Sequence, residues 1–174
     1  MSEIKPPVFA DAAEFFAEAL AIELEASERY ELLADQMEVH NNRAIAAIFR
    51  KMSAIEAEHH KEIARLAAAA KLDGLRAKFS WTGADGPEAT DLSEAHYLMT
   101  PRQALGLARH NEERAAAYFE AIAAEATDPT VRAFAATMAS DERRHVVWVD
   151  QWIAKYEADD PNWDEDPDPA VITE

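Results

Sequence analysis

Cysteine is absent from this chain of 174 residues, which excludes disulfides, thiolate zinc sites, iron–sulfur clusters and thiol catalysis. Positive charge is also in short supply, because 34 Asp and Glu face only 17 Lys and Arg and leave a net charge of −17. Nucleic acids and anionic lipid surfaces attract basic proteins, so this imbalance argues against both as partners. It is compatible with metal cations as ligands.

Long apolar runs are missing as well, since no stretch approaches the length that spans a membrane. The first residues, which include Pro6 and Pro7, lack the basic region and apolar stretch of a secretory signal. We therefore expect a cytoplasmic protein without a membrane segment. Apolar residues still make up 49% of the chain, which is enough for the core of one globular domain.

Glycine is scarce, and three of the four glycines lie within residues 72–99. Elsewhere Ala, Glu, Leu and Arg dominate, and this composition favours helix. Four helix-start signals divide the chain into four long helical segments. These signals are Asp11 with Glu14, the turn Asn41–Asn42 with Asn42 as N-cap, Thr100–Pro101 with Gln103, and Asp128–Pro129.

The connections between these segments predict how they are arranged. The first and second segments, like the third and fourth, are separated by only a few residues, so each pair forms an antiparallel hairpin. Residues 72–99 are numerous enough to run the length of a helix. The sequence therefore predicts an all-α, ferritin-like four-helix bundle in which a long crossover joins two hairpins. We assign residues 1–158 to this domain and residues 159–174, rich in acids and proline, to an acidic tail.

Acidic and imidazole side chains interrupt the apolar stripe of every predicted helix. In residues 43–71 the stripe contains Glu56 and His59, and in the segment that begins at 129 it contains Glu142 and His145. The other two segments each place one glutamate, Glu23 or Glu112, at the corresponding depth. Burying several unpartnered carboxylates is costly, so a metal-free structural bundle would leave them unexplained.

The pattern is also repeated within the chain. Residues 23–34 align with 112–123, and residues 45–59 align with 131–145, so that both Glu–His pairs fall at equivalent points. Side chains at positions i and i+3 share a helix face and can bind one ion together. Four carboxylates and two imidazoles form a complete ligand set for two divalent cations. The predicted metal ligands are Glu23, Glu56, His59, Glu112, Glu142 and His145. Glu113 is an alternative to Glu112, because an assignment from periodicity can slip by one residue.

These residues carry a family resemblance. The segments "EASERYELLA", "MSAIEAEHHKEIARL" and "MASDERRHVVWV" resemble the rubrerythrin branch of the ferritin-like dimetal-carboxylate superfamily, over residues 12–155. The resemblance implies the same six ligands and a homodimer or higher homo-oligomer. Two positions depart from the family: there is no cysteine for a rubredoxin module, and Ala115 stands where rubrerythrins carry an extra Glu. An electron donor would therefore be another molecule.

Two further side chains are candidates for a supporting role. Tyr30 is placed to hydrogen-bond a ligating glutamate from the third helix, and the alternative is an ordinary core aromatic. Asp141 is placed to orient His59 by accepting from its free ring N–H, and the alternative is an exposed helix acid.

The function predicted from this set is an oxidoreductase with two metal ions per chain. Carboxylate-rich sites with two imidazoles suit iron, with manganese as the alternative. We expect peroxidase-like or ferroxidase-like chemistry with hydrogen peroxide or O₂ and an external electron donor. Three other functions use the same ligands: non-enzymatic iron binding or storage, a manganese catalase-like reaction, and monooxygenation of an organic substrate.

Overall fold

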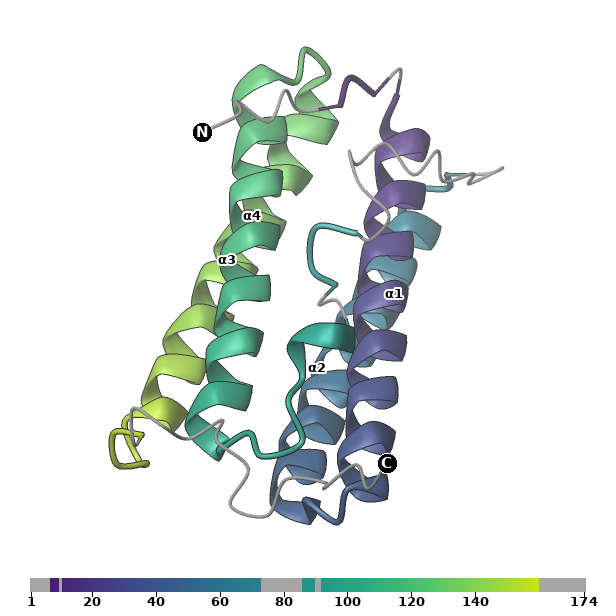
Figure 1. Cartoon of the computed structure of the whole chain (residues 1–174). Coiled ribbons are helices and arrows are strands. Elements are labelled where there is room, and N and C mark those ends of the chain that lie inside the picture. The colour runs from purple at the N-terminus through teal and green to yellow at the C-terminus, as the bar shows by residue number, and fades with distance from the viewer. Residues whose placement is uncertain (1–6, 10, 73–85, 90–91, 160–174) are drawn as a thin grey trace, which may run out of the picture.

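The computed structural model describes residues 7–9, 11–72, 86–89 and 92–159. Their helices are α1 (Ala12–Val39), α2 (Arg43–Ala69), the short 3₁₀ helix η1 (Leu92–Glu94), α3 (Pro101–Glu125) and α4 (Pro129–Ile153). No strand occurs in these ranges. Helix α1 packs along α2 and α3 packs along α4, as two antiparallel hairpins (Figure 1). The predicted all-α, ferritin-like four-helix bundle is confirmed.

Three of the four helices begin with the predicted cap. The Asp11 carboxylate accepts from the Glu14 N–H at 3.0 Å, and Asp128 accepts from the backbone N–H of Thr130 and Val131. At α3, Thr100 and Gln103 form a reciprocal capping box, and Pro101 opens the helix. These local bonds satisfy backbone donors that the first helical turn leaves unpaired.

Asn42 precedes α2 as predicted, but its side chain does not cap the helix. The Asn42 amide instead donates to the carbonyl oxygens of Tyr97, at 3.4 Å, and Met99, at 3.0 Å. The preceding residue, Asn41, adopts a φ of 58°, a left-handed conformation that asparagine tolerates. Asn42 is thus the N-cap residue of α2, as predicted, while the end of the crossover takes up its side chain.

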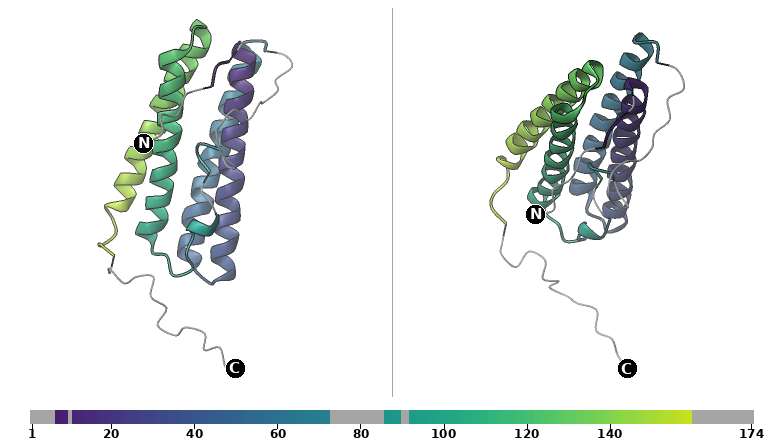
Figure 2. Two further views of the ribbon diagram at one scale, coloured as in Figure 1. Left: turned by 45° about the horizontal axis from the view of Figure 1, so that its top comes forward. Right: turned by 90° about the horizontal axis from the view of Figure 1, so that it is seen from above.

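The described parts of the crossover lie between the two hairpins. Residues 86–89 form a turn between them, and residues 92–99 follow towards the start of α3 (Figures 1 and 2). Gln36 Nε2 on α1 donates to the Ala95 carbonyl at 3.2 Å, and Ala95 and Met99 are buried. These described residues of the connection are therefore part of the packed interior.

The apolar core is divided into two clusters by a layer of acidic and imidazole side chains. One cluster fills the end of the bundle where α1 ends and α2 begins, around Leu33, Phe49 and Leu105. The other fills the opposite end, around Phe16, Phe119 and Val131. Along every long helix the charged positions fall between these two clusters, so the bundle excludes water from both sides of that layer.

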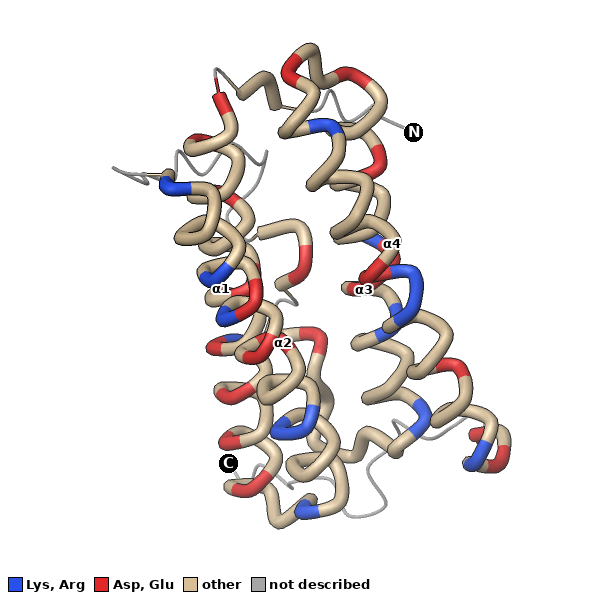
Figure 3. The backbone as a smooth tube through the Cα atoms, turned by 180° about the vertical axis from the view of Figure 1, so that it is seen from behind, with Lys and Arg blue, Asp and Glu red and all other residues tan. Residues whose placement is uncertain are grey.

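None of the described helices has both the length and the apolar character that crossing a membrane requires. Asp and Glu outnumber Lys and Arg along the helices (Figure 3). Of the predicted acidic tail, 159–174, all but Asp159 lies outside the described residues. Asp159 itself accepts from the Thr100 hydroxyl at 2.6 Å.

Candidate metal centre

The six predicted ligands lie in one layer across the middle of the bundle. Their side chains come from all four long helices: Glu23 from α1, Glu56 and His59 from α2, Glu112 from α3, and Glu142 and His145 from α4. The four glutamates are each 0% exposed. His145 is 3% exposed, whereas the His59 side chain keeps 22% of its surface accessible. One edge of the layer, at His59, therefore approaches solvent.

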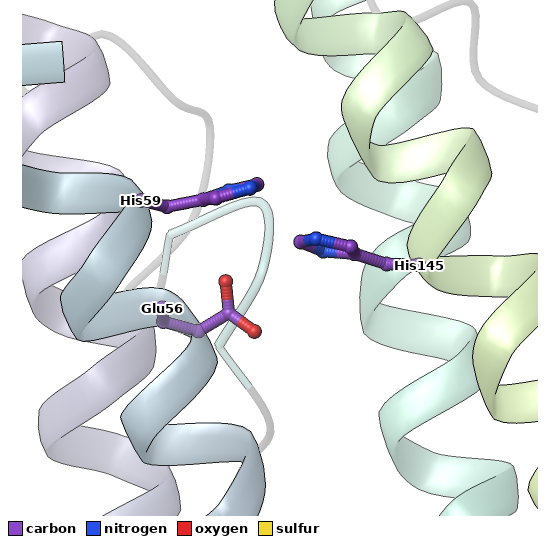
Figure 4. A group of neighbouring side chains, drawn as sticks. All are labelled: Glu56, His59 and His145. Atoms are coloured by element: carbon purple, nitrogen blue, oxygen red, sulfur yellow. The ribbon is translucent and has the colours of Figure 1, made fainter. Parts of the chain in front are cut away.

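Short distances join these side chains across the bundle. His145 Nδ1 lies 3.1 Å from Glu112 Oε2 and 3.3 Å from Glu142 Oε2. His59 Nδ1 lies 3.6 Å from both Glu23 Oε2 and Glu142 Oε1. Glu56 and His59 extend from α2 towards His145 on α4, and the two imidazole rings are 4.4 Å apart (Figure 4). The i, i+3 spacing thus brings both Glu–His pairs to one place.

The donor set fits metal ions. Potential ligand atoms of Glu112, Glu142 and His145 lie within 4.8 Å of one another, and so do those of Glu23, His59 and Glu142 and those of Glu56, His59 and His145. Both carboxylate oxygens of Glu23, Glu56 and Glu142 are buried without a hydrogen-bond partner among the described residues. Buried carboxylates are normally paired or bound to a metal, so these oxygens point to cations as the missing partners.

Without a metal, three of these four carboxyls have pKa values above the ordinary range. Burial raises the pKa of Glu23 to about 7, against the partly opposing effect of His59. Burial, together with neighbouring carboxylates, raises the pKa values of Glu56 and Glu112 well above the usual range. A metal ion that binds here therefore displaces protons.

Glu142 is the exception because it lies between both imidazoles. Burial alone would raise its pKa, but the imidazoles of His145 and His59 beside it hold that pKa at about 2. In the same way, burial would lower the pKa of His59, yet its contacts with Glu142 and Glu23 raise it to about 11. Glu142 thus links the ligands of the two hairpins as an ionised carboxylate.

One acidic side chain of the cluster was missed by the sequence analysis. Glu88, in the crossover, is 1% exposed, and its carboxylate lies within 4.8 Å of those of Glu23 and Glu56. Burial and the charges of Glu142 and Glu23 raise its pKa well above the usual range. Helical periodicity could not identify it, because Glu88 lies in a turn outside every helix.

The two predicted supporting residues take different places. The Tyr30 hydroxyl is buried and accepts from Asn111 Nδ2 at 3.1 Å, beside Glu112 in the chain. Asp141 forms an ion pair with Arg144 and lines a small cavity together with His59. Their roles towards a metal ligand remain predictions.

Glu113, the alternative to Glu112, lies outside the cluster. Its side chain is 39% exposed and forms an ion pair with Arg109 at 2.8 Å. The geometry therefore favours Glu112 as the candidate ligand from α3.

Comparison with known proteins agrees with this architecture. The rubrerythrin family matches residues 14–98, which include nearly all of α1, the whole of α2 and most of the crossover. The solved structure of an uncharacterized conserved protein from Magnetospirillum magnetotacticum MS-1 is 39% identical, with a TM-score of 0.62, over 93% of this chain and 99% of that one. No curated protein matches.

The fold and the carboxylate layer define a ferritin-like bundle with side chains that can bind a dimetal centre. The chain is rubrerythrin-like, because that family matches residues 14–98, and the 39% identical conserved protein covers both hairpins. A rubrerythrin domain implies a dimetal site.

Trp148 gives a direct optical test of metal binding at this layer. Its ring stacks on His145, with centroids 5.1 Å apart, and is 43% exposed. We expect anaerobic Co(II) to quench tryptophan fluorescence, and we expect Trp148→Phe to remove most of that change. Trp152→Phe is the matched control, because Trp152 lies under Lys51 Nζ instead. Equal quenching in wild type and Trp148→Phe would place the ion elsewhere.

Proposed function

We propose that this protein is a di-iron oxidoreductase that reduces hydrogen peroxide, or O₂, with electrons from an external donor. The observation that carries the proposal is the layer of buried carboxylates without hydrogen-bond partners, completed by two imidazoles. The rubrerythrin match over residues 14–98 supports the dimetal class of site. Oxygen donors with two imidazole nitrogens favour iron, and manganese is the alternative.

The six predicted ligands would hold the ions. A ferrous pair supplies the two electrons that reduce the O–O bond of a peroxide. The chain's contribution is to hold its carboxylates and imidazoles close together in a layer closed on both sides by apolar clusters. Because the glutamates carry full negative charge once metal displaces their protons, they stabilise the higher charge of the oxidised ions.

A small cavity reaches the layer at its exposed edge. It has a volume of about 40 Å³ and is lined by His59, Glu142 and Asp141, with Phe16 and Met138 among the apolar residues around them. A single water needs roughly 10–15 Å³ on this measure, so the cavity accepts a molecule of a few heavy atoms. This size supports peroxide or O₂ as substrate and disfavours a large organic substrate at this entrance.

A larger hollow of about 440 Å³ lies elsewhere, near Met99, Arg102 and Ile153. None of the six predicted ligands lines it. The size of this hollow therefore says nothing about the substrate of the metal centre.

Stopped-flow oxidation tests the proposal. The protein is loaded anaerobically with Fe(II) and mixed with hydrogen peroxide, and the formation of Fe(III) is followed by absorbance. We expect oxidation at least about tenfold faster than that of the same Fe(II) in buffer, because the ligands hold the ions together in a dry site. A rate no greater than that of free Fe(II) would refute the peroxidase role.

A further inference from the structure

We propose that Glu88 is a further metal ligand, delivered to the centre by the crossover between α2 and α3. The inference rests on the proposed dimetal site and extends it beyond the six residues on the four long helices. It makes the centre asymmetric, because the ion on the α1–α2 side would gain a third carboxylate that the other ion lacks.

The Glu88 carboxylate has the burial and the isolation of a ligand. The residue is 1% exposed, and both of its carboxylate oxygens lack a hydrogen-bond partner in the part of the chain that the structure describes. Its nearest group of potential ligands consists of Glu23 and Glu56, with one carboxylate oxygen of each of the three within 4.8 Å of the others. Three buried carboxylates at this distance repel one another strongly unless a cation lies between them.

The backbone around Glu88 is fixed by both hairpins. The Gly86 N–H donates to Glu25 Oε2 on α1 at 3.1 Å. From α3, Arg114 donates to the carbonyl oxygens of Gly86, at 3.0 Å, and Ala89, at 3.3 Å. These bonds clamp the turn that lies between the two hairpins (Figure 1), on either side of Glu88, whose carboxylate is buried.

The second half of the internal repeat shows what Glu88 adds. There Glu112 and Glu142, the counterparts of Glu23 and Glu56, are grouped with the imidazole of His145. On the other side Glu23 and Glu56 are each grouped with His59, and in addition they form a group with Glu88, a third carboxylate. A group of three oxygen donors is the harder ligand set and carries more negative charge, so Glu88 would strengthen binding of the ion on the α1–α2 side.

Anaerobic calorimetric titration with Co(II) tests this assignment, with Glu88→Gln as the variant. Gln keeps the shape of the side chain and removes its charge. We expect two Co(II) per wild-type chain, and we expect Glu88→Gln to weaken one of the two binding steps at least about tenfold while leaving the other. Glu94→Gln is the matched control, because Glu94 is an exposed acid of the same crossover and should bind as wild type does.

A second variant keeps the test decisive if Glu88→Gln does not fold. Arg114→Met keeps the Glu88 side chain but removes the two bonds from α3 that hold its turn, and we expect it to weaken the same step. Thermal melting of the metal-free proteins shows which variants are folded. Unchanged binding of both ions in the folded variants would overturn the role of Glu88, whereas a wild-type protein that binds no Co(II) would overturn the dimetal site itself.

Discussion

Replacing Glu56 and Glu142 together with alanine will abolish metal binding at the centre. The two glutamates come from different hairpins, and each belongs to more than one group of potential ligands. Glu142 also lies beside both imidazoles, 3.3 Å from His145 Nδ1 and 3.6 Å from His59 Nδ1, so its loss affects both ions. We expect elemental analysis of protein purified without chelators to show about two Fe or Mn per wild-type chain and almost none in the double variant.

The matched control is Glu58→Ala with Glu113→Ala, which removes the same charge from exposed positions. Glu58 and Glu113 are 72% and 39% exposed and pair with Lys61 and Arg109. Circular dichroism shows whether both double variants keep their helices. If the control loses its metal while the Glu56/Glu142 variant keeps it, the candidate ligand layer is wrong.

The helices and the position of the charged layer could be predicted because their causes are local. Caps such as Thr100 with Gln103 involve neighbouring residues, and the stripe that contains Glu56 and His59 follows from the helical repeat alone. The internal repeat then predicted that Glu142 and His145 lie at the same depth as Glu56 and His59, and this inference needs no tertiary contact.

Glu88 and the Asn42 side chain could not be predicted in the same way. Both depend on where the crossover lies relative to the helices, which no periodic pattern encodes. Gly86 is bonded to Glu25 and to Arg114, which are both far from it in the chain. The turn that contains Glu88 is therefore held in place only in the assembled bundle. A buried acid in an irregular segment has no sequence signal comparable to an interrupted stripe.

Removing the metal will destabilise the protein, and this loss of stability will increase as the pH rises. Two bound ions at free concentrations of about 1,000 times their Kd would each add roughly 4 kcal/mol to the free energy of unfolding. For a chain of this size 1 kcal/mol corresponds to about 2–4 °C in Tm. We therefore expect chelation at neutral pH to lower the melting temperature by ~10 °C or more.

The pH dependence follows from the direction of the pKa shifts. The raised pKa values of Glu23, Glu56 and Glu112 mean that the folded metal-free chain holds protons that the unfolded chain has already lost above pH 4.5. His59, with its pKa raised to about 11, acts in the same direction above pH 6.5. Each extra proton held by the folded state lowers its stability by about 1.4 kcal/mol per pH unit.

Between pH 5 and 8 the metal-free protein should thus melt at steadily lower temperature. Glu142 does not oppose this trend, because its lowered pKa of about 2 matters only below pH 4.5. The metal-loaded protein should change little or become more stable, since deprotonation of the ligands favours the ions. Differential scanning calorimetry of both forms across this range measures the difference between their melting temperatures. If that difference becomes smaller as the pH rises, the ions do not replace protons on these carboxylates.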